Sequence, residues 1–160
     1  MKMIFRNRAL TFVIVVLAFA ITSSAQLSEG GGRLAGTWDT TVSITNCMTG
    51  DVFTSFQSVG SFHQGGTFNG ITAGTPPAAR TPEIGVWRHD IKNRYAFRFK
   101  AFLFDPSGVA IAYQLIRHNI YLSTDAMSYV SSGEAQVFNM AGIQIGGGCS
   151  SAVATRMTVD

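Results

Sequence analysis

Hydrophobic and polar residues alternate along most of the chain after position 35. Between Gly36 and Asn46, for example, every second side chain is Trp, Thr, Val or Ile, and the positions between them hold Asp, Thr and Ser. Such alternation is typical of a β-strand with one buried face. The same pattern predicts further strands at 53–63, 67–72, 86–90, 94–104, 109–122, 127–138, 143–145 and 152–157.

Short polar segments separate these strands, and none of the sequence after Ala25 keeps a helical period. Segment 105–108 reads Asp-Pro-Ser-Gly, which suits a type I turn. Segment 73–85 holds three of the four prolines and is predicted to be a surface loop, long enough to act as a lid. Eight or nine strands in simple succession predict an all-β fold: a single antiparallel up-and-down β-barrel of about eight strands, because closure removes the exposed edges.

Strand pairing predicts which side chains face the barrel interior. If Phe104 pairs with Val109 and Leu122 pairs with Met127, period-two geometry separates an aromatic face from a basic one. The outer face then carries Arg94, Arg98, Lys100, Arg117, Asn119 and Glu134. The inner face carries Tyr95, Phe97, Phe99, Gln114, Ile116, His118, Ile120 and Tyr129, which are the predicted ligand-binding residues, followed by Ser131, Gly133, Ala135 and Val137. Eight strands lie at the boundary between a filled core and a ligand cavity.

The same register leaves an apolar stripe on the outer face, at Phe102, Phe104, Val109, Ile111, Tyr113 and Leu115. Monomeric proteins rarely leave such a stripe uncovered. A β-bulge near Lys100 would turn part of it inward. Otherwise a second copy of the chain, a membrane surface or segment 73–85 covers it. A cover on the outside is favoured over a bulge, because a bulge in one strand would not hide the stripe on the partner strand.

The first 25 residues resemble a secretory signal peptide. Lys2, Arg6 and Arg8 precede an apolar run from Ala9 to Ile21, and Ser23-Ser24-Ala25 suits a cleavage site. The predicted organisation is a signal peptide at 1–25, a flexible lead at 26–34 and a β-barrel domain at 35–160, secreted or periplasmic. An uncleaved anchor is the alternative, but the run is short for a membrane span.

Export changes both the charge and the redox state of the chain. The whole sequence has 12 basic and 9 acidic residues, and removal of three basic residues with the leader leaves nine of each. The basic pI of the whole chain therefore gives no support for nucleic-acid binding. Cys47 and Cys149 are the only cysteines, and an oxidising compartment predicts a disulfide between them.

No catalytic residue, metal ligand set or cofactor is predicted. His63, His89 and His118 lie on different predicted strands without a ligand spacing. His118 is the one titratable side chain placed inside, where Tyr95 or Ser131 could satisfy it; the alternative is a polar anchor or general base. The cations of segment 88–117 outnumber its two acids, which fits a solvated outer face or contact with an anionic surface.

Gly36-x-Trp38 on the first strand, together with Arg156 on the last, resembles the signature of the calycin superfamily, which includes lipocalins and fatty-acid-binding proteins. The resemblance implies that Trp38 closes the barrel floor, that Arg156 packs across it, and that both are structural. It also implies ligand binding in the interior. Two departures are that only four residues follow Arg156, too few for a C-terminal helix, and that no helical lid is present. Segments 62–66, 80–82 and 85–87 are similar to those of small secreted bacterial proteins.

The expected function is therefore an exported barrel that binds a small apolar or amphipathic molecule, with Gln114 and His118 as orienting polar contacts. One alternative is an enzyme of the small-barrel cyclase type, which shapes a reactive substrate with few acid–base groups. A buried carboxylate or a Tyr–His pair in a sealed cavity would favour it. The other alternative is a structural or interaction module with a filled core.

Overall fold

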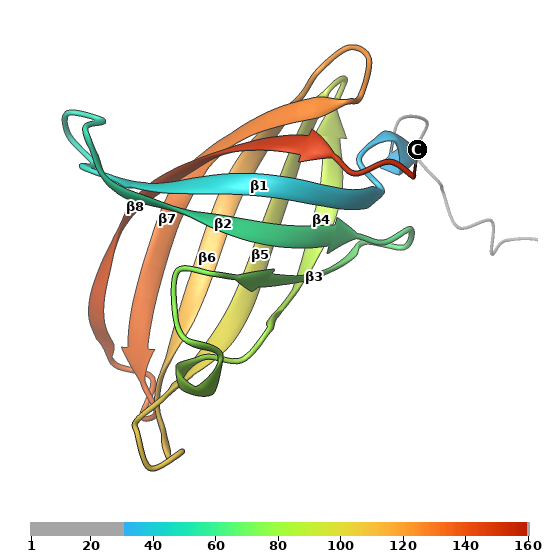
Figure 1. Cartoon of the computed structure of the whole chain (residues 1–160). Helices are drawn as coiled ribbons and strands as arrows, with labels where there is room; N and C mark the ends of the chain where they lie inside the picture. Colours follow the sequence, from blue (N-terminus) through green and yellow to red (C-terminus); the bar gives the residue numbers. More distant parts are fainter. Residues whose placement is uncertain (1–30, 160) are drawn as a thin grey trace, which may run out of the picture.

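The computed structural model describes residues 31–159, and the predicted signal peptide lies outside this range. Eight antiparallel strands form a closed barrel in which each strand pairs with the next and β1 pairs with β8 (Figure 1). The predicted fold class is thereby confirmed. The strands are β1 (Gly36–Thr45), β2 (Val52–Phe62), β3 (Thr67–Thr72), β4 (Glu83–Ile91), β5 (Arg94–Phe104), β6 (Ala110–Leu122), β7 (Ser128–Asn139) and β8 (Gln144–Arg156). Two short 3₁₀ turns, η2 (Gly31–Arg33) and η3 (Pro77–Ala79), lie outside the sheet.

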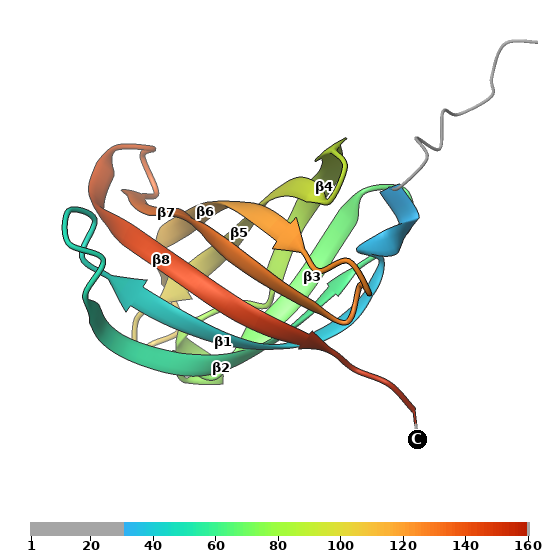
Figure 2. The ribbon, with the colours of Figure 1, turned by 90° about the horizontal axis from the view of Figure 1, so that it is seen from above.

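The two ends of the barrel differ. Figures 1 and 2 show η2 and the end of β8 at the same end of the barrel, where the β2–β3, β4–β5 and β6–β7 turns also lie. We call this the closed end. The other end carries the β1–β2, β5–β6 and β7–β8 hairpin tips and the long β3–β4 connection. We call this the open end. None of the described residues forms a helix with the length and hydropathy that crossing a bilayer requires.

The predicted faces of the sheet agree with burial in the structure. Along β6, Ile116, His118 and Ile120 are buried, whereas Arg117 and Asn119 between them are exposed. The predicted pairings, however, are wrong by two residues: Phe97 pairs with His118 instead of Ile116. Both hairpin loops are longer than assumed, and Leu122 pairs with Tyr129 across the next one. An even shift keeps every side chain on its predicted face.

Two strand boundaries also differ from the prediction. Segments 143–145 and 152–157 belong to one continuous strand, β8, because Gly146, Gly147 and Gly148 pair with β7. The barrel therefore has eight strands and not nine. The strand predicted at 86–90 begins earlier, at Glu83, which pairs with Gly70 of β3.

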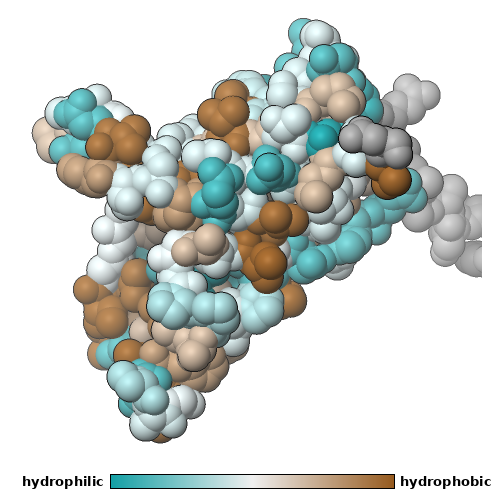
Figure 3. Space-filling model, viewed as in Figure 1, coloured by the Kyte–Doolittle hydropathy of each residue, from teal (hydrophilic) through white to brown (hydrophobic). Residues whose placement is uncertain are grey.

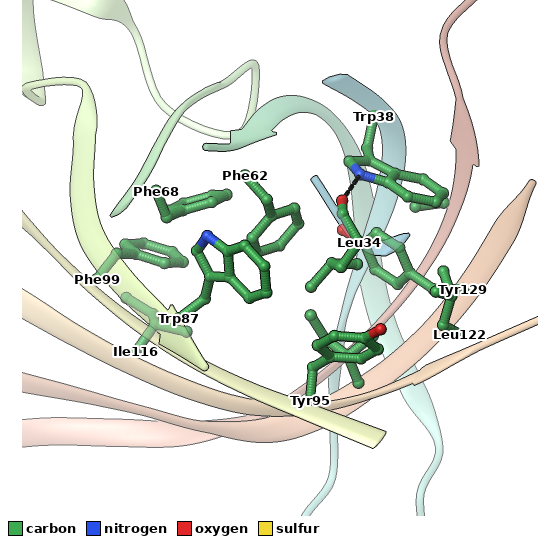
Figure 4. Close-up of a cluster of buried hydrophobic side chains, with 12 residues drawn as sticks. Leu34, Trp38, Phe62, Phe68, Trp87, Tyr95, Phe99, Ile116, Leu122 and Tyr129 are labelled. Carbon is green, nitrogen blue, oxygen red and sulfur yellow. Dashed lines mark hydrogen bonds between the residues drawn. The ribbon is translucent and has the colours of Figure 1, made fainter. Parts of the chain in front are cut away.

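The closed end is filled by large apolar and aromatic side chains (Figure 4). Trp38 is fully buried and donates its indole N–H to the carbonyl oxygen of Leu34 at 3.0 Å, and its ring packs 4.9 Å from that of Tyr129. Leu34 is itself fully buried, so the packed part of the chain begins before the predicted domain boundary at 35. The cluster comprises Leu34, Trp38, Phe62, Phe68, Trp87, Tyr95, Phe99, Ile116, Ile120, Leu122, Tyr129 and Ala154.

Arg156 fastens the N-terminal segment across this end. Its guanidinium lies 4.3 Å from the centre of the Trp38 ring and donates hydrogen bonds to the carbonyl oxygens of Arg33, Ala35 and Ala126. Gly36 makes room for this arrangement, since it adopts a φ of 139° and a Cβ there would lie 2.3 Å from Nη1 of Arg156. The Gly36-x-Trp38 spacing and Arg156 thus form one structural unit.

The predicted disulfide between Cys47 and Cys149 is confirmed. Their Cα atoms are 5.1 Å apart, and the bond joins positions 102 residues apart in sequence. Cys149 pairs with Thr45 where β1 and β8 meet, so the bond ties the β1–β2 hairpin to the last strand. A cross-link over a loop of this length restricts the unfolded chain, which stabilises the fold by an amount on the order of 2–4 kcal/mol.

The apolar stripe of β5 and β6 lies on the outside of the barrel. No bulge occurs near Lys100; the register shifts only beyond Leu103, and Ile111 is 52% exposed. Segment 73–85 reaches this region through Thr81, which bonds the backbone of Phe102, yet Phe102 stays partly exposed. Figure 3, which views the opposite side, shows a separate apolar patch over β2 and β3, where Val59 pairs with Ile71.

Candidate functional site

A cavity of about 380 Å³ occupies the half of the barrel nearer the open end. All eight strands contribute to its lining, together with the β3–β4 connection. Thr54 is exposed and Phe56 is half-buried at its rim, so the cavity reaches solvent there. Its volume lies at the small end of the range for pockets that hold drug-sized molecules.

The cavity wall is partly apolar and partly polar. The apolar contributions come from Val42, Ile44, Phe56, Phe68, Phe97, Phe99, Ile116, Ala135 and Ala152. The polar contributions come from Thr40, Thr54, Ser58, Thr72, Thr75, Arg80, Glu83, Gln114, His118, Tyr129, Ser131 and Ser150. An apolar wall with a few fixed polar groups is the usual composition of a site for a small organic molecule.

Arg80 and Glu83 form a buried ion pair on one side of the cavity. Nη1 of Arg80 donates to Oε1 of Glu83 at 2.9 Å, and Nε of Arg80 donates to Oε1 of Gln114 at 3.0 Å. Burial raises the pKa of Glu83, and the neighbouring guanidinium opposes that rise. Because a charge is expensive to bury without its partner, this pair holds the β3–β4 connection against the sheet.

His118, on β6 like Gln114, lies between two serine hydroxyls. Its Nδ1 is 3.0 Å from Oγ of Ser131 and its Nε2 is 2.8 Å from Oγ of Ser150. Burial lowers the pKa of His118 from 6.5 to about 4, so the ring is neutral at pH 7. One ring nitrogen therefore donates and the other accepts, and both are already occupied.

Gly133 on β7 permits this placement of the imidazole. A Cβ at position 133 would lie 2.7 Å from Cδ2 of His118 and 1.9 Å from the carbonyl oxygen of Arg117. The Phe97 ring packs edge-on against the imidazole, with ring centres 5.7 Å apart. Packing and two hydrogen bonds therefore fix the orientation of His118.

Tyr129 marks the boundary between the cavity and the packed closed end. Its hydroxyl lies 3.4 Å from Oγ1 of Thr40, and burial raises its pKa to about 12. A phenol with this pKa stays protonated at physiological pH and serves as a hydrogen-bond donor or acceptor. Its role is to supply a fixed polar contact at the inner end of the cavity.

The predicted ligand-binding residues divide between the two halves of the barrel. Six of them line the cavity: Phe97, Phe99, Gln114, Ile116, His118 and Tyr129. Tyr95 and Ile120 share the inner face but lie nearer the closed end, where they are almost fully buried in the packed cluster. Period-two alternation identifies the face of a strand and carries no information about the depth of a cavity along it.

Arg80, Glu83, Ser58 and Ser150 were not predicted as site residues. The prolines of segment 73–85 predict a surface loop, and residues of a surface loop are not expected to form a buried ion pair. A usable signal exists for Glu83, since it lies an even number of residues before the inward Trp87 and therefore shares its face. Nothing in the local sequence places Arg80 inside, because its position follows from the path of the connection.

Within residues 31–159, no group of three or more His, Cys, Asp or Glu side chains is placed to hold a metal ion. Of the buried titratable groups in the cavity, Glu83 pairs with Arg80 through Oε1, and His118 is bonded at both ring nitrogens. The arrangement is suited to orienting a bound molecule by hydrogen bonds. His118 has no ring nitrogen free to accept a substrate proton as a general base would.

No protein-family model, curated protein or solved structure matches this chain. The cavity and the side chains that line it are therefore the features from which a function can be inferred.

Proposed function

We propose that this protein is an exported binding protein that holds a small amphipathic molecule inside its barrel. The observation that carries the proposal is the cavity of about 380 Å³ with an apolar wall and a few oriented polar groups. Gln114, Tyr129 and the Arg80–Glu83 pair would contact the polar part of the ligand. Phe97, Phe99 and Ile116 would contact its apolar part.

The ligand would carry a neutral polar group. The one cation in the lining, Arg80, is already paired with the one carboxylate, Glu83, so the described cavity has no uncompensated charge. His118 stays neutral well below pH 7, and a hydroxyl, carbonyl or amide could exchange hydrogen bonds with such a wall without leaving a buried charge unpaired.

Two further features support export and kinship with calycins as parts of this proposal. The disulfide between Cys47 and Cys149 is compatible with an oxidising compartment, and the first 25 residues have the layout of a signal peptide. The contact of Arg156 with Trp38 in a closed eight-stranded barrel fits the calycin resemblance. The lining does contain a buried carboxylate, Glu83, but it is paired with Arg80 and the cavity reaches solvent at Thr54. Together with the occupied His118, these features argue against the cyclase-type enzyme, and the cavity argues against a filled core.

The proposal is tested with a neutral fluorescent probe, N-phenyl-1-naphthylamine. Ala135 lines the cavity on β7, so Ala135→Phe should fill part of the space and weaken probe binding at least about tenfold, equivalent to about 1.4 kcal/mol. Ser132→Phe adds the same side chain to the outer face of β7 and should bind as the wild type does. Ala152→Leu, on the cavity side of β8, gives a second block if Ala135→Phe folds poorly.

Equal probe binding by the wild type and by a folded cavity-filling variant would refute the proposal. If the variant binds the probe more weakly, native mass spectrometry of the protein purified from its own cells, compared with Ala135→Phe prepared identically, would identify the natural ligand. A mass carried by the wild type and absent from the variant is the expected result.

A further inference from the structure

A second hollow lies on the outer face of the barrel, away from the interior cavity. It has a volume of about 840 Å³ and crosses β4, β5, β6, β7 and β8. Its outward side chains are Val86, Arg88, Ala96, Arg98, Arg117, Asn119, Glu134 and Cys149, the last as part of the disulfide. We call it the arginine trough. Trp87, Phe97, His118 and Gly133 also border it, but the first three have side chains on the inner face of the barrel.

The strand register explains both the hollow and its charge. Ala96 on β5 lies between Arg88 on β4 and Asn119 on β6, so a small side chain forms the floor. Arg98, the next outward residue on β5, lies directly opposite Arg117 of β6. Diagonal neighbours on one face of a sheet are about 7–8 Å apart, within reach of long side chains, so Arg88 can approach the same point as Arg98.

This arrangement is unfavourable in the absence of an anion. Like charges directly opposite on paired strands destabilise a sheet. Among residues 31–159, Arg88 and Arg98 form no ion pair, and Arg117 has a single partner, Glu134, at 3.7 Å with both side chains about half exposed. Such an exposed pair contributes little, so most of the positive charge of the trough is uncompensated.

We propose that the arginine trough is a binding site for clustered phosphate groups. Three guanidinium groups around an alanine floor offer planar forks that match phosphate oxygens in pairs, which lysine could not do. The phosphate could belong to a soluble molecule or to a lipid headgroup. Single-stranded nucleic acid fits less well, because no aromatic side chain points outward into the trough to stack a base. This proposal goes beyond the interior ligand, since the arginines face away from the cavity.

The first test uses inorganic tripolyphosphate and isothermal titration calorimetry. Arg98→Gln and Arg117→Gln should each weaken binding about tenfold. Arg94→Gln is the matched control: it removes the same charge from the outer face of β5, but Arg94 lies outside the trough and its guanidinium packs over Tyr121. Sodium sulfate at the same ionic strength controls for screening.

Thermal unfolding adds a readout that a purely structural role would not give. Without added anion, Arg98→Gln should melt at the same temperature as the wild type or higher, because it removes a like-charge pair. With tripolyphosphate the wild type should gain stability and Arg98→Gln should gain much less. Binding no tighter than that of sulfate, or equal weakening by Arg94→Gln, would overturn the proposal.

The source of the phosphate is distinguished with vesicles. Sedimentation with phosphatidylcholine vesicles that contain phosphatidic acid, lost on removal of the acidic lipid and in Arg98→Gln, would assign a lipid headgroup. Binding of tripolyphosphate without vesicle binding would assign a soluble phosphate compound. Tighter binding of a single-stranded oligonucleotide than of tripolyphosphate would contradict the proposal. Each variant should still bind N-phenyl-1-naphthylamine normally, so the two proposals fail separately.

Discussion

The buried imidazole of His118 should make the folding stability of this barrel depend on pH. His118 is 6% exposed, and burial lowers its pKa from 6.5 to about 4. Below about pH 6.5 the unfolded chain binds a proton at this side chain, whereas the folded protein binds it only near pH 4. The unfolded state therefore holds more protons in this window, and stability falls as the pH decreases through it.

The size of the effect follows from the two pKa values. The difference between 6.5 and about 4 corresponds to about 3 kcal/mol in full, and roughly 2 kcal/mol of it is lost between pH 7 and pH 4.5. For a domain of this size that is a decrease in melting temperature of roughly 6–10 °C. Glu83 acts in the opposite direction, because burial raises its pKa and the folded protein gains its proton at a higher pH.

The assay is urea unfolding followed by tryptophan fluorescence at several pH values, for the wild type and for His118→Gln. The glutamine cannot titrate, so the contribution of Glu83 is common to both proteins and cancels in the difference. The wild type should lose roughly 2 kcal/mol more than the variant on going from pH 7 to pH 4.5. His63→Gln, which removes an exposed histidine, should follow the wild type. Parallel pH profiles for the wild type and His118→Gln would refute the reasoning.

Two further predictions concern the closed end and the outer stripe. Gly36→Ala should destabilise the fold by about 1–3 kcal/mol in urea unfolding, because Gly36 has a positive φ and the new Cβ would displace Arg156. Gly108→Ala is the control, since Gly108 also has a positive φ but has open space around it. A loss of stability in Gly108→Ala as large as that in Gly36→Ala would contradict the role given to Arg156. If a second copy covers the stripe, Ile111→Asp should convert a dimer into a monomer in analytical ultracentrifugation. Ile71→Asp, on the opposite side of the barrel, should leave the dimer intact. A wild-type protein that is monomeric and does not bind vesicles would refute the prediction that the stripe is covered.

The sequence predicts the faces of the strands well and their registers less well, for a physical reason. Face assignment needs only the alternation of side chains, which is local. Register depends on the hairpin loop and on irregularities beside it. The Asp105 carboxylate accepts hydrogen bonds from the backbone N–H groups of Ser107 and Val109, and Phe104 pairs with Ala110, one residue beyond the predicted Val109. The register shift between Leu103 and Phe104 adds the second residue. In the next turn the Asp125 carboxylate accepts a hydrogen bond from the backbone N–H of Met127, and Ala126 between them adopts a positive φ before β7 begins at Ser128.

The cavity was only partly predictable for a different reason. Aromatic residues at alternate positions of β5 indicate an interior, and Phe97 and Phe99 do line the cavity. The charged pair does not follow from any local pattern, because burying Arg80 is acceptable only when the fold brings Glu83 and Gln114 to it. Pro82 also led the sequence to predict too late a start for β4, since proline is excluded from central strands and β4 begins directly after it, at Glu83.

The separation of the packed half from the polar half has a consequence for how substitutions should act. Trp38, Leu34 and Arg156 hold the closed end together without touching the cavity, so changes there should lower stability and leave the shape of the binding site intact. Val42 and Ile44 lie in the other half, where the neighbouring empty volume means that truncation leaves few packing contacts to lose. Binding and stability should therefore respond to different residues, which allows a ligand-binding role for the interior to be tested without unfolding the barrel.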